Sequence, residues 1–392
     1  MGTSGTRRAL ICGAGIAGLA AALRLHRSGW RTLIVERAPG RRSGGYMVNL
    51  VDGGFDAAER LGLVPALKDR DLGLFTSVIV RADGTAKFAV PKEIVAASVG
   101  PRALTVFRGD LEAALYEAVR DLAEIRFGTT AAAIEQDPDG VTAVLSDGRT
   151  ERADLLIGAD GLHSGTRGLA FAAAPDPLVD MGHMVGAIPL DASPAGLEAG
   201  TGTTYIGPGR TAAVISLGPG RSSAFFAYRT TDTAAQLRLG PARALSEAFG
   251  DLGGGVPDAL RRLRADPGPG PAYFDSASQV RLDSWSSGRV ALLGDAAWCV
   301  TLFAGYGAAL AMSGADRLGD ALDREADVPA ALKSWEAGLR PETAKRQALA
   351  RRGMAQFAPP TKGHVWMNEA AMRAMRVPAL RGLMLRAARA AK

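Results

Sequence analysis

A glycine loop near the start of the chain could bind phosphate groups. It consists of Gly13, Ala14, Gly15, Ile16, Ala17 and Gly18. In such a loop the first glycine permits a tight turn, the second lets a phosphate approach the backbone, and the third lets a helix pack closely against a strand. Because the free N–H groups of a helix N-terminus also attract anions, the pattern predicts a pyrophosphate site.

The flanking residues place this loop between a strand and a helix. Apolar runs at 7–12 and 31–35 predict two buried strands, and the spacing over 16–28 predicts a helix, which together make a βαβ unit. Glu36 closes the second strand about 20 residues beyond the loop, where a carboxylate accepts hydrogen bonds from ribose hydroxyls. We include its neighbour Arg37 in the predicted site. This fingerprint serves NAD and FAD alike.

Two later motifs decide between these dinucleotides. One apolar strand leads into Asp160-Gly161, and another leads into Gly294-Asp295. Both would deliver an aspartate to the carboxyl end of a strand, where ligands bind in open α/β sheets. An aspartate there could accept hydrogen bonds from a polyol chain, which FAD has as ribitol and NAD lacks. The motifs therefore favour FAD.

With the glycine loop, these motifs give the chain a resemblance to a known family. It resembles the group A FAD-dependent monooxygenases, the para-hydroxybenzoate hydroxylase-like aromatic hydroxylases. The resemblance is clearest over residues 7–170 and 280–325. It implies that Glu36 holds the adenosine ribose and that Asp160 shapes the approach of the cofactor and of a nicotinamide. Asp295, next to Gly294, would bind the ribityl chain.

The resemblance assigns further residues to FAD. Arg42, shortly before Gly45, matches a family arginine close to the flavin, and Arg108 matches one that contacts FAD near the ribityl and phosphate groups. A helix would begin beside the flavin ring, and its N–H groups would stabilise negative charge on the reduced flavin. The residues that would open this helix are Gly305, Gly307 and Ala308.

The chain departs from the family pattern beside the expected flavin ring. Segment 298–303 lacks the usual His and Pro, and Tyr306 stands where many relatives carry Gln. No catalytic base is identified by the sequence. The resemblance implies an enzyme that uses NADH or NADPH and O2 to oxygenate an apolar, aromatic or polyketide-like small molecule, as in antibiotic biosynthesis. A non-redox cyclisation or isomerisation by an FAD enzyme of this fold, and a non-enzymatic FAD-binding module, are the alternatives.

The fold class that we expect is α/β. A Rossmann-type FAD-binding domain would carry an inserted, mostly antiparallel β-sheet substrate domain and C-terminal helices. The FAD-binding domain would comprise residues 1–75, 101–174 and 277–350, the substrate domain 76–100 and 175–276, and the helical tail 351–392. Since ligand pockets favour domain interfaces, the substrate should lie between the two domains. The candidate substrate contacts are Tyr46, Met47, Tyr205, Arg210, Tyr228 and Phe303.

Turn residues and periodicity predict the remaining elements. Asp83-Gly84 indicates a hairpin over 77–90, and Asp110 is expected to cap a helix over 110–122. We also expect a meander of three strands, short strands in the insert with one helix, and a basic tail helix that docks on the body or lies on a membrane surface. The meander strands are expected at 129–135, 141–146 and 151–157, and the strands of the insert at 203–206, 212–217 and 224–229. The helix of the insert is expected at 234–249 and the tail helix at 368–392.

The composition excludes several other classes of protein. The 392 residues carry a net charge of +6, but the arginines are scattered without an aromatic-studded stripe, so no nucleic-acid partner is expected. The four histidines lie far apart and the two cysteines, Cys12 and Cys299, have no zinc spacing, so no metal site is expected. No apolar stretch predicts a membrane span, and we expect two reduced cysteines in a cytoplasmic protein. The sequence leaves the oligomeric state open.

Overall fold

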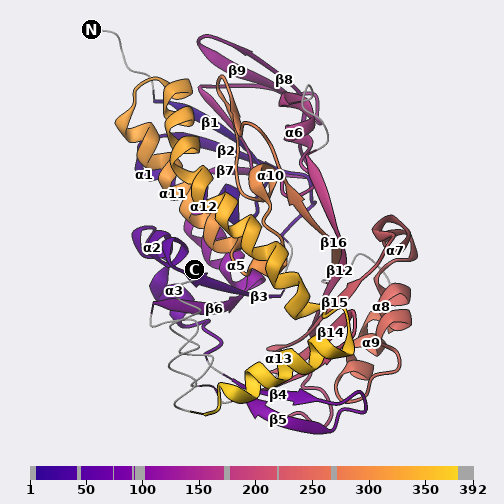
Figure 1. Cartoon of the computed structure of the whole chain (residues 1–392). Coiled ribbons are helices and arrows are strands. Elements are labelled where there is room, and N and C mark those ends of the chain that lie inside the picture. Colours follow the sequence, from indigo (N-terminus) through magenta and orange to yellow (C-terminus); the bar gives the residue numbers. More distant parts are fainter. Residues whose placement is uncertain are drawn as a thin grey trace.

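The computed structural model describes residues 6–41, 46–73, 75–90, 92, 102–171, 177–218, 220–265 and 272–377. A six-stranded sheet and a seven-stranded sheet form its two main parts (Figure 1). The first sheet has the order β17-β18-β11-β1-β2-β7 and is parallel except for β17. Its strands are Arg8–Cys12 (β1), Arg31–Glu36 (β2), Glu124–Phe127 (β7), Leu155–Gly158 (β11), Ser286–Ser287 (β17) and Val290–Leu292 (β18).

Both faces of the parallel sheet are buried, which explains the uninterrupted apolar runs in its strands. Ala9 and Ile11 of β1 pack toward a helical layer, whereas Leu10 and Cys12 pack toward a small three-stranded sheet. The helical layer contains α1 (Ile16–Arg27), α5 (Arg108–Val119) and α11 (Gly307–Arg324), and the small sheet contains β8 (Ala131–Asp137), β9 (Gly140–Leu145) and β10 (Thr150–Ala153). The glycine loop therefore lies between β1 and α1, as expected.

Two of the predicted elements in this part need correction. The segment predicted as one strand over 151–157 is two strands, β10 and β11, which meet at Asp154 and belong to different sheets. The Asp154 carboxylate accepts a hydrogen bond of 2.7 Å from the backbone N–H of Arg8, which fixes the crossing point. The helix predicted to begin at Asp110 begins at Arg108, because Phe107 has the extended conformation of a cap and Asp110 lies in the first turn.

The seven-stranded sheet has the order β16-β12-β15-β14-β13-β4-β5. Only β13 and β4 pair in parallel, so the expected mostly antiparallel insert and its 77–90 hairpin are present. Its strands are Thr76–Val80 (β4), Ala86–Val90 (β5), Leu178–Leu190 (β12), Thr201–Gly207 (β13), Arg210–Ser216 (β14), Ser222–Arg229 (β15) and Tyr273–Val280 (β16).

The insert contains two strands and two helices that were not predicted. Strand β12 includes Gly182, His183 and Pro189, which weaken the strand pattern, and Pro189 is tolerated because β12 pairs with β16 only up to Ala187. The helix expected over 234–249 is broken at Gly240, whose φ of 75° ends one helix before the next begins. The three helices that cover one face of this sheet are Thr233–Leu239 (α7), Pro241–Phe249 (α8) and Val256–Ala265 (α9).

Short elements and two C-terminal helices join the two sheets. Figure 1 shows α12 running from the helical layer to the seven-stranded sheet, where Phe357 packs against Phe225 at a ring distance of 6.5 Å. The proposed boundary at residue 350 falls inside this helix; the other domain boundaries stay predictions. The remaining elements are β3 (Met47–Val51), β6 (Ala103–Phe107), α2 (Gly53–Arg60), α3 (Val64–Lys68), α6 (Gly165–Ala170), α10 (Asp295–Trp298), a 3-10 turn (Leu302–Ala304), α12 (Val328–Phe357) and α13 (Lys362–Ala374).

The tail helix docks on the seven-stranded sheet. It begins at Lys362, six residues before the predicted start, and residues beyond 377 lie outside the described part. Met372 and Met375, with Val365, pack against Phe88 and its buried neighbours in β4, β5 and β13. This contact supports the docked alternative over a surface-lying one. Within the described ranges, no helix is both long enough and apolar enough to cross a membrane.

Candidate active site

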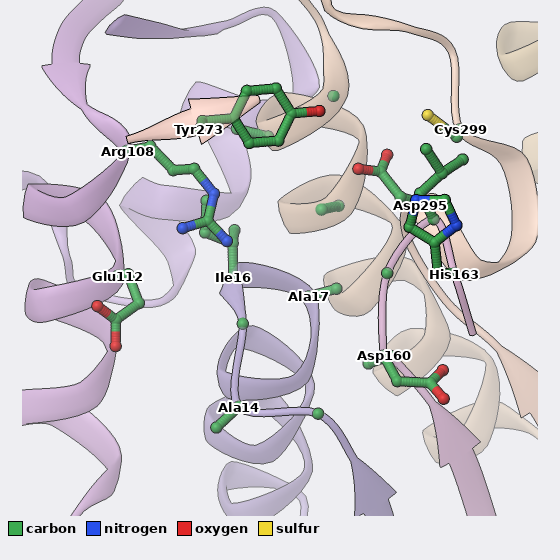
Figure 2. A pocket seen from close by; sticks show the side chains of 18 of the residues that line it. Ala14, Ile16, Ala17, Arg108, Glu112, Asp160, His163, Tyr273, Asp295 and Cys299 are labelled. Atoms are coloured by element: carbon green, nitrogen blue, oxygen red, sulfur yellow. The ribbon is translucent and has the colours of Figure 1, made fainter. Parts of the chain in front are cut away.

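A cavity of about 470 Å³ lies between the two main sheets, and Figure 2 shows side chains from both parts around it. The glycine loop, Glu36 and Asp160 line one part of it, and Tyr46 and Tyr273 line another. Several predicted residues are thus brought together from distant parts of the sequence: Gly13, Ala14, Gly15, Ile16, Ala17, Glu36, Arg37, Tyr46, Met47, Arg108, Asp160, Asp295, Gly305, Gly307 and Ala308 all line the cavity.

The glycine loop leaves open the space that a pyrophosphate would need. Gly13 has a φ of 111°, and its N–H donates a 2.7 Å hydrogen bond to Val35. A side chain there would overlap the carbonyl group of Ala159. By contrast, a β-carbon on Gly15 would meet nothing closer than the Arg108 guanidinium at 4.0 Å. The loop therefore presents the N-terminus of α1 to the cavity, with Arg108 above it.

Glu36 is held in place before any ligand binds. One carboxylate oxygen accepts a 2.9 Å hydrogen bond from the N–H of Ala14, and the other accepts a 2.8 Å bond from the N–H of Ala38. These bonds aim the carboxylate along the end of β2 into the cavity. Its remaining lone pairs are available to two ribose hydroxyls, which fits the role that the sequence predicted.

The N-terminal half of α5 supplies charges above the loop. Figure 2 shows Arg108 extending from α5 toward Ile16 at the start of α1. One turn later, the buried Glu112 accepts a 3.1 Å hydrogen bond from Arg41, whose guanidinium also lies 4.4 Å from the ring centre of Tyr116. Arg41 and Glu112 line the cavity but were not predicted. The i,i+4 spacing of Arg108 and Glu112 places both side chains on one face of α5, and this was the sequence signal that could have identified Glu112.

Asp160 fixes the shape of its own loop. Its carboxylate accepts hydrogen bonds from Ser164 Oγ at 2.5 Å and from the backbone and hydroxyl of Thr166 at 2.9 and 3.0 Å. The buried Arg167 then donates to the carbonyls of Leu162 and Ala296, at 2.7 and 3.0 Å. These bonds tie the start of α6 to α10, so the two aspartate motifs are positioned relative to each other.

Asp295 opens α10 and lines the cavity. Burial raises the pKa of its carboxyl group, while the Cys299 thiol and the Arg108 guanidinium lower it. Burial likewise raises the pKa of Cys299 well above its ordinary value, so the thiol stays protonated at neutral pH. In Figure 2 the two side chains lie next to each other. A carboxylate that faces the open cavity is suited to hydroxyl donors such as a ribityl chain.

Two tyrosines form the wall opposite the glycine loop. The rings of Tyr46 and Tyr273 meet edge to face with centres 5.4 Å apart. Burial raises the pKa of both phenols, so both keep their protons and can donate hydrogen bonds. Ser276 and Ser278, whose hydroxyls lie 3.0 Å apart, line the same wall. Tyr273 was not predicted, because the polar sequence of β16 does not resemble a buried strand.

Three predicted substrate contacts lie on the wrong face of the seven-stranded sheet. Tyr228 donates a 2.7 Å hydrogen bond to Gln236 and packs against Phe249, under the helices α7 and α8. Arg210 pairs with Asp251 at 2.6 Å and lies over the ring of Tyr205. Successive side chains of a strand point to opposite faces, so these three point away from the cavity. None of them lines it.

The other predicted residues occupy intermediate positions. Phe303 does not line the cavity: it is buried in an apolar cluster behind Val185, whereas Val185 itself and the neighbouring Thr301 and Leu302 reach the cavity surface. Gly18, inside α1, and Gly294, just before α10, do not line the cavity themselves. Arg42 and Gly45 lie outside the described residues.

The cavity also has a contact between its two walls at His163. The Nε2 atom of His163 lies 3.0 Å from the carboxylate of Asp275 in β16. His163 belongs to the loop after Asp160, and its side chain is half exposed. The contact therefore joins the loop that follows the parallel sheet to the seven-stranded sheet, and it borders the cavity on that side.

Thr301 has a strained backbone in the segment that departs from the family pattern. Its φ is 73° and its ψ is 155°, a region that is almost exclusive to glycine. Its side chain is buried, and its hydroxyl has no hydrogen-bond partner within the described residues. Such strain persists only where the surroundings enforce it, and here it shapes the wall beside Cys299.

We expect Thr301→Gly to raise the free energy of unfolding of the apoprotein by about 1 kcal/mol, because it removes the strain and the unsatisfied hydroxyl at the cost of some chain entropy. Thr211→Gly is the matched control, since Thr211 is also buried with an unpartnered hydroxyl among the described residues but has no positive φ. That variant should lose about 1–2 kcal/mol. Urea unfolding of the two variants checks the sign, and equal losses would contradict the expectation.

Comparison with known proteins agrees with this arrangement. The chain belongs to the FAD binding domain family, which it matches over residues 6–337. Within that family it is a group A flavin-dependent monooxygenase. A flavin-dependent monooxygenase from an unknown prokaryotic organism is 29% identical over 311 residues, which cover 78% of each chain. The aurachin C monooxygenase/isomerase of Stigmatella aurantiaca is 29% identical over 328 residues, 84% of each chain.

A solved structure shows the same similarity across nearly the whole chain. The crystal structure of tetracycline destructase Tet(51) superposes with a TM-score of 0.77 at 27% identity, and the match covers 94% of this chain and 96% of that one. The cofactor of the protein is FAD, and the site has the features that FAD requires. The carboxylate of Glu36 suits the ribose, the open loop at Gly15 suits the pyrophosphate, and the carboxylate of Asp295 at the cavity surface suits the ribityl chain.

Proposed function

We propose that this monooxygenase uses NADH or NADPH and O2 to hydroxylate an apolar, aromatic or polyketide-like small molecule. One observation carries the proposal: a single cavity joins the FAD residues to a wall made of Tyr46, Tyr273, Val185 and Leu302. Such a wall offers ring faces, methyl groups and neutral phenol donors to a flat substrate. Bound FAD supplies the electron transfer and the activation of oxygen.

The distribution of charge in the cavity supports an uncharged substrate. The arginines among its described lining residues are Arg37, Arg41 and Arg108, and each is on an element next to the glycine loop or Glu36. The wall formed by β12 and β16 offers phenol and serine hydroxyls instead. A carboxylate on the substrate would lack a cation there, whereas phenol or ketone oxygens could accept hydrogen bonds from these hydroxyls.

The similar proteins support the size and type of the proposed substrate. Two of them are named for tetracycline destruction and for aurachin C. We propose that this chain likewise acts on a multi-ring compound in specialised metabolism. The residues named above would orient the substrate: the phenols donate hydrogen bonds and the apolar wall excludes water from the flavin edge.

A non-redox cyclisation or isomerisation is the second candidate. The segment 298–303 differs from the family pattern, and its Thr301 has an unusual backbone. A relative with monooxygenase/isomerase in its name also points to this chemistry. In this case FAD would act as a fixed part of the cavity wall.

One experiment separates the two candidates. The purified FAD protein is mixed without oxygen with NADH or NADPH, and flavin bleaching is followed with phenolic and polyketide-like compounds, each with and without a carboxylate. The proposal expects bleaching that is accelerated by an uncharged compound, followed on aeration by a product one oxygen atom heavier. A flavin that stays oxidised while a compound is converted to an isomer of equal mass would establish the second candidate instead.

A further inference from the structure

Three side chains meet behind the N-terminus of α11, on the side away from the cavity. Asp52 precedes α2, Tyr306 caps α11, and Arg346 belongs to α12. The Asp52 carboxylate accepts hydrogen bonds from the Tyr306 hydroxyl at 3.3 Å and from Arg346 Nη2 at 3.2 Å. The Arg346 guanidinium also stacks on the Tyr306 ring, 3.6 Å from its centre. We call these three residues the α11 clamp.

Two features of the α11 clamp oppose folding. Arg346 is only 8% exposed, and its Nε and Nη1 atoms have no hydrogen-bond partner within the described residues. Asp52 has a φ of 50° and a ψ of −131°, which side chains other than glycine rarely adopt. Unsatisfied buried donors and a strained backbone each oppose folding. Features of this kind cluster at sites where they serve the function of the protein.

The α11 clamp lies behind the helix turn that lines the cavity. Gly305 and Gly307 line the cavity, whereas Tyr306 between them does not, so its side chain points to the opposite side. The carbonyl of Tyr306 accepts a 2.8 Å hydrogen bond from Leu310 and thus belongs to the first turn of α11. The direction of the free N–H groups at Gly307 and Ala308 therefore depends on where Tyr306 is held.

We propose that the α11 clamp consists of positioning residues that aim the N-terminal N–H groups of α11 at the flavin ring and so favour the reduced, negatively charged flavin over the oxidised one. A helix N-terminus stabilises an anion only when its N–H groups point at the charge, and the effect falls off within one turn. The inference concerns the cofactor and holds for any substrate.

The decisive variant is Asp52→Gly. Glycine accepts a positive φ without strain, which offsets part of the cost of leaving Tyr306 and the buried Arg346 without their acceptor, so the variant should still fold. We expect the dissociation constant of reduced FAD, relative to that of oxidised FAD, to rise about tenfold, which lowers the two-electron reduction potential by about 30 mV. Asp52→Asn keeps an acceptor and tolerates the backbone, so it should shift the potential less.

Two further measurements make the test complete. Tyr306→Phe keeps the stacking but loses the hydroxyl, and it should shift the potential in the same direction as Asp52→Gly. Asp121→Asn, at an exposed position remote from the cavity, is the control and should leave the potential unchanged. Thermal unfolding of each apoprotein separates folding from positioning. A folded Asp52→Gly protein that binds FAD with the same flavin potential as the parent would overturn the proposal.

Discussion

A Gly15→Ala variant is expected to fold normally and to lose FAD. The backbone at Gly15 has a φ of −81° and a ψ of −175°, which alanine adopts without strain. The added methyl group would meet no atom closer than 4.0 Å in the protein itself, but it would occupy the space over the N-terminus of α1. We therefore expect the affinity for FAD to fall at least about 100-fold, or about 2.7 kcal/mol, while the apoprotein keeps its stability.

The measurement is a titration of the apoprotein with FAD, followed by flavin fluorescence, together with thermal unfolding. Gly338→Ala is the matched control, because Gly338 lies inside α12 and nothing is within 4 Å of its missing side chain. That variant should bind FAD normally and gain about 0.5–1 kcal/mol from the better helix former. A yellow Gly15→Ala protein with unchanged affinity would show that the pyrophosphate lies elsewhere.

The second large effect is expected for Asp295→Asn, which should change FAD affinity and apoprotein stability in opposite directions. The amide is neutral, so the hydrogen bonds that a ribityl chain donates to this position lose their charge, and the affinity should fall about 10- to 100-fold. In the apoprotein, burial raises the pKa of Asp295 above its ordinary value of 3.8. The ionised group therefore opposes folding at neutral pH, and its removal should stabilise the apoprotein.

The pH dependence gives the sign of this effect. Because the folded protein holds the Asp295 proton to a higher pH than the unfolded chain does, the parent loses stability as the pH rises from the ordinary aspartate pKa through the raised one. Asp295→Asn lacks that loss. The free energy of unfolding of the variant should therefore equal that of the parent in acid, exceed it increasingly across this pH window, and exceed it by a constant amount above the window. Denaturant unfolding at several pH values checks the trend, with Asp139→Asn, exposed in the β8–β9 turn, as the control. An advantage that is independent of pH would contradict the assignment.

The sequence could place the glycine loop and Glu36 together at the cavity because short-range rules determine their positions. A strand, three glycines and a helix are consecutive in the chain, and Glu36 follows at a distance set by one βαβ unit. The same reasoning could not identify Arg41 or Glu112, since their meeting depends on how α5 packs against the chain after β2.

The substrate wall was predicted poorly for a different reason. A shift of one residue along a strand moves a side chain from one face of the sheet to the other. When helices cover one face and the cavity lies on the other, both faces carry apolar residues, so the local sequence does not tell them apart. The prediction therefore assigned Tyr228 to the wrong face of its strand, whereas Phe225 and Ala227 of the same strand pack behind the cavity. Tyr273 was missed because its strand, β16, is recognisable only through its pairing with β12.

The order of strands in the parallel sheet determines when during synthesis the protein can acquire its cofactor. Strand β1 pairs with β11, where Ala9 faces Leu155, and β11 pairs with β18, where Leu156 faces Val290. A growing chain must therefore keep its glycine loop without its final neighbours until Asp295 and the start of α11 have left the ribosome. Such long-range pairing slows folding, and FAD can stabilise only the nearly finished chain. Flavin supply would then influence the yield of folded protein only late in synthesis, after the start of α11 has emerged.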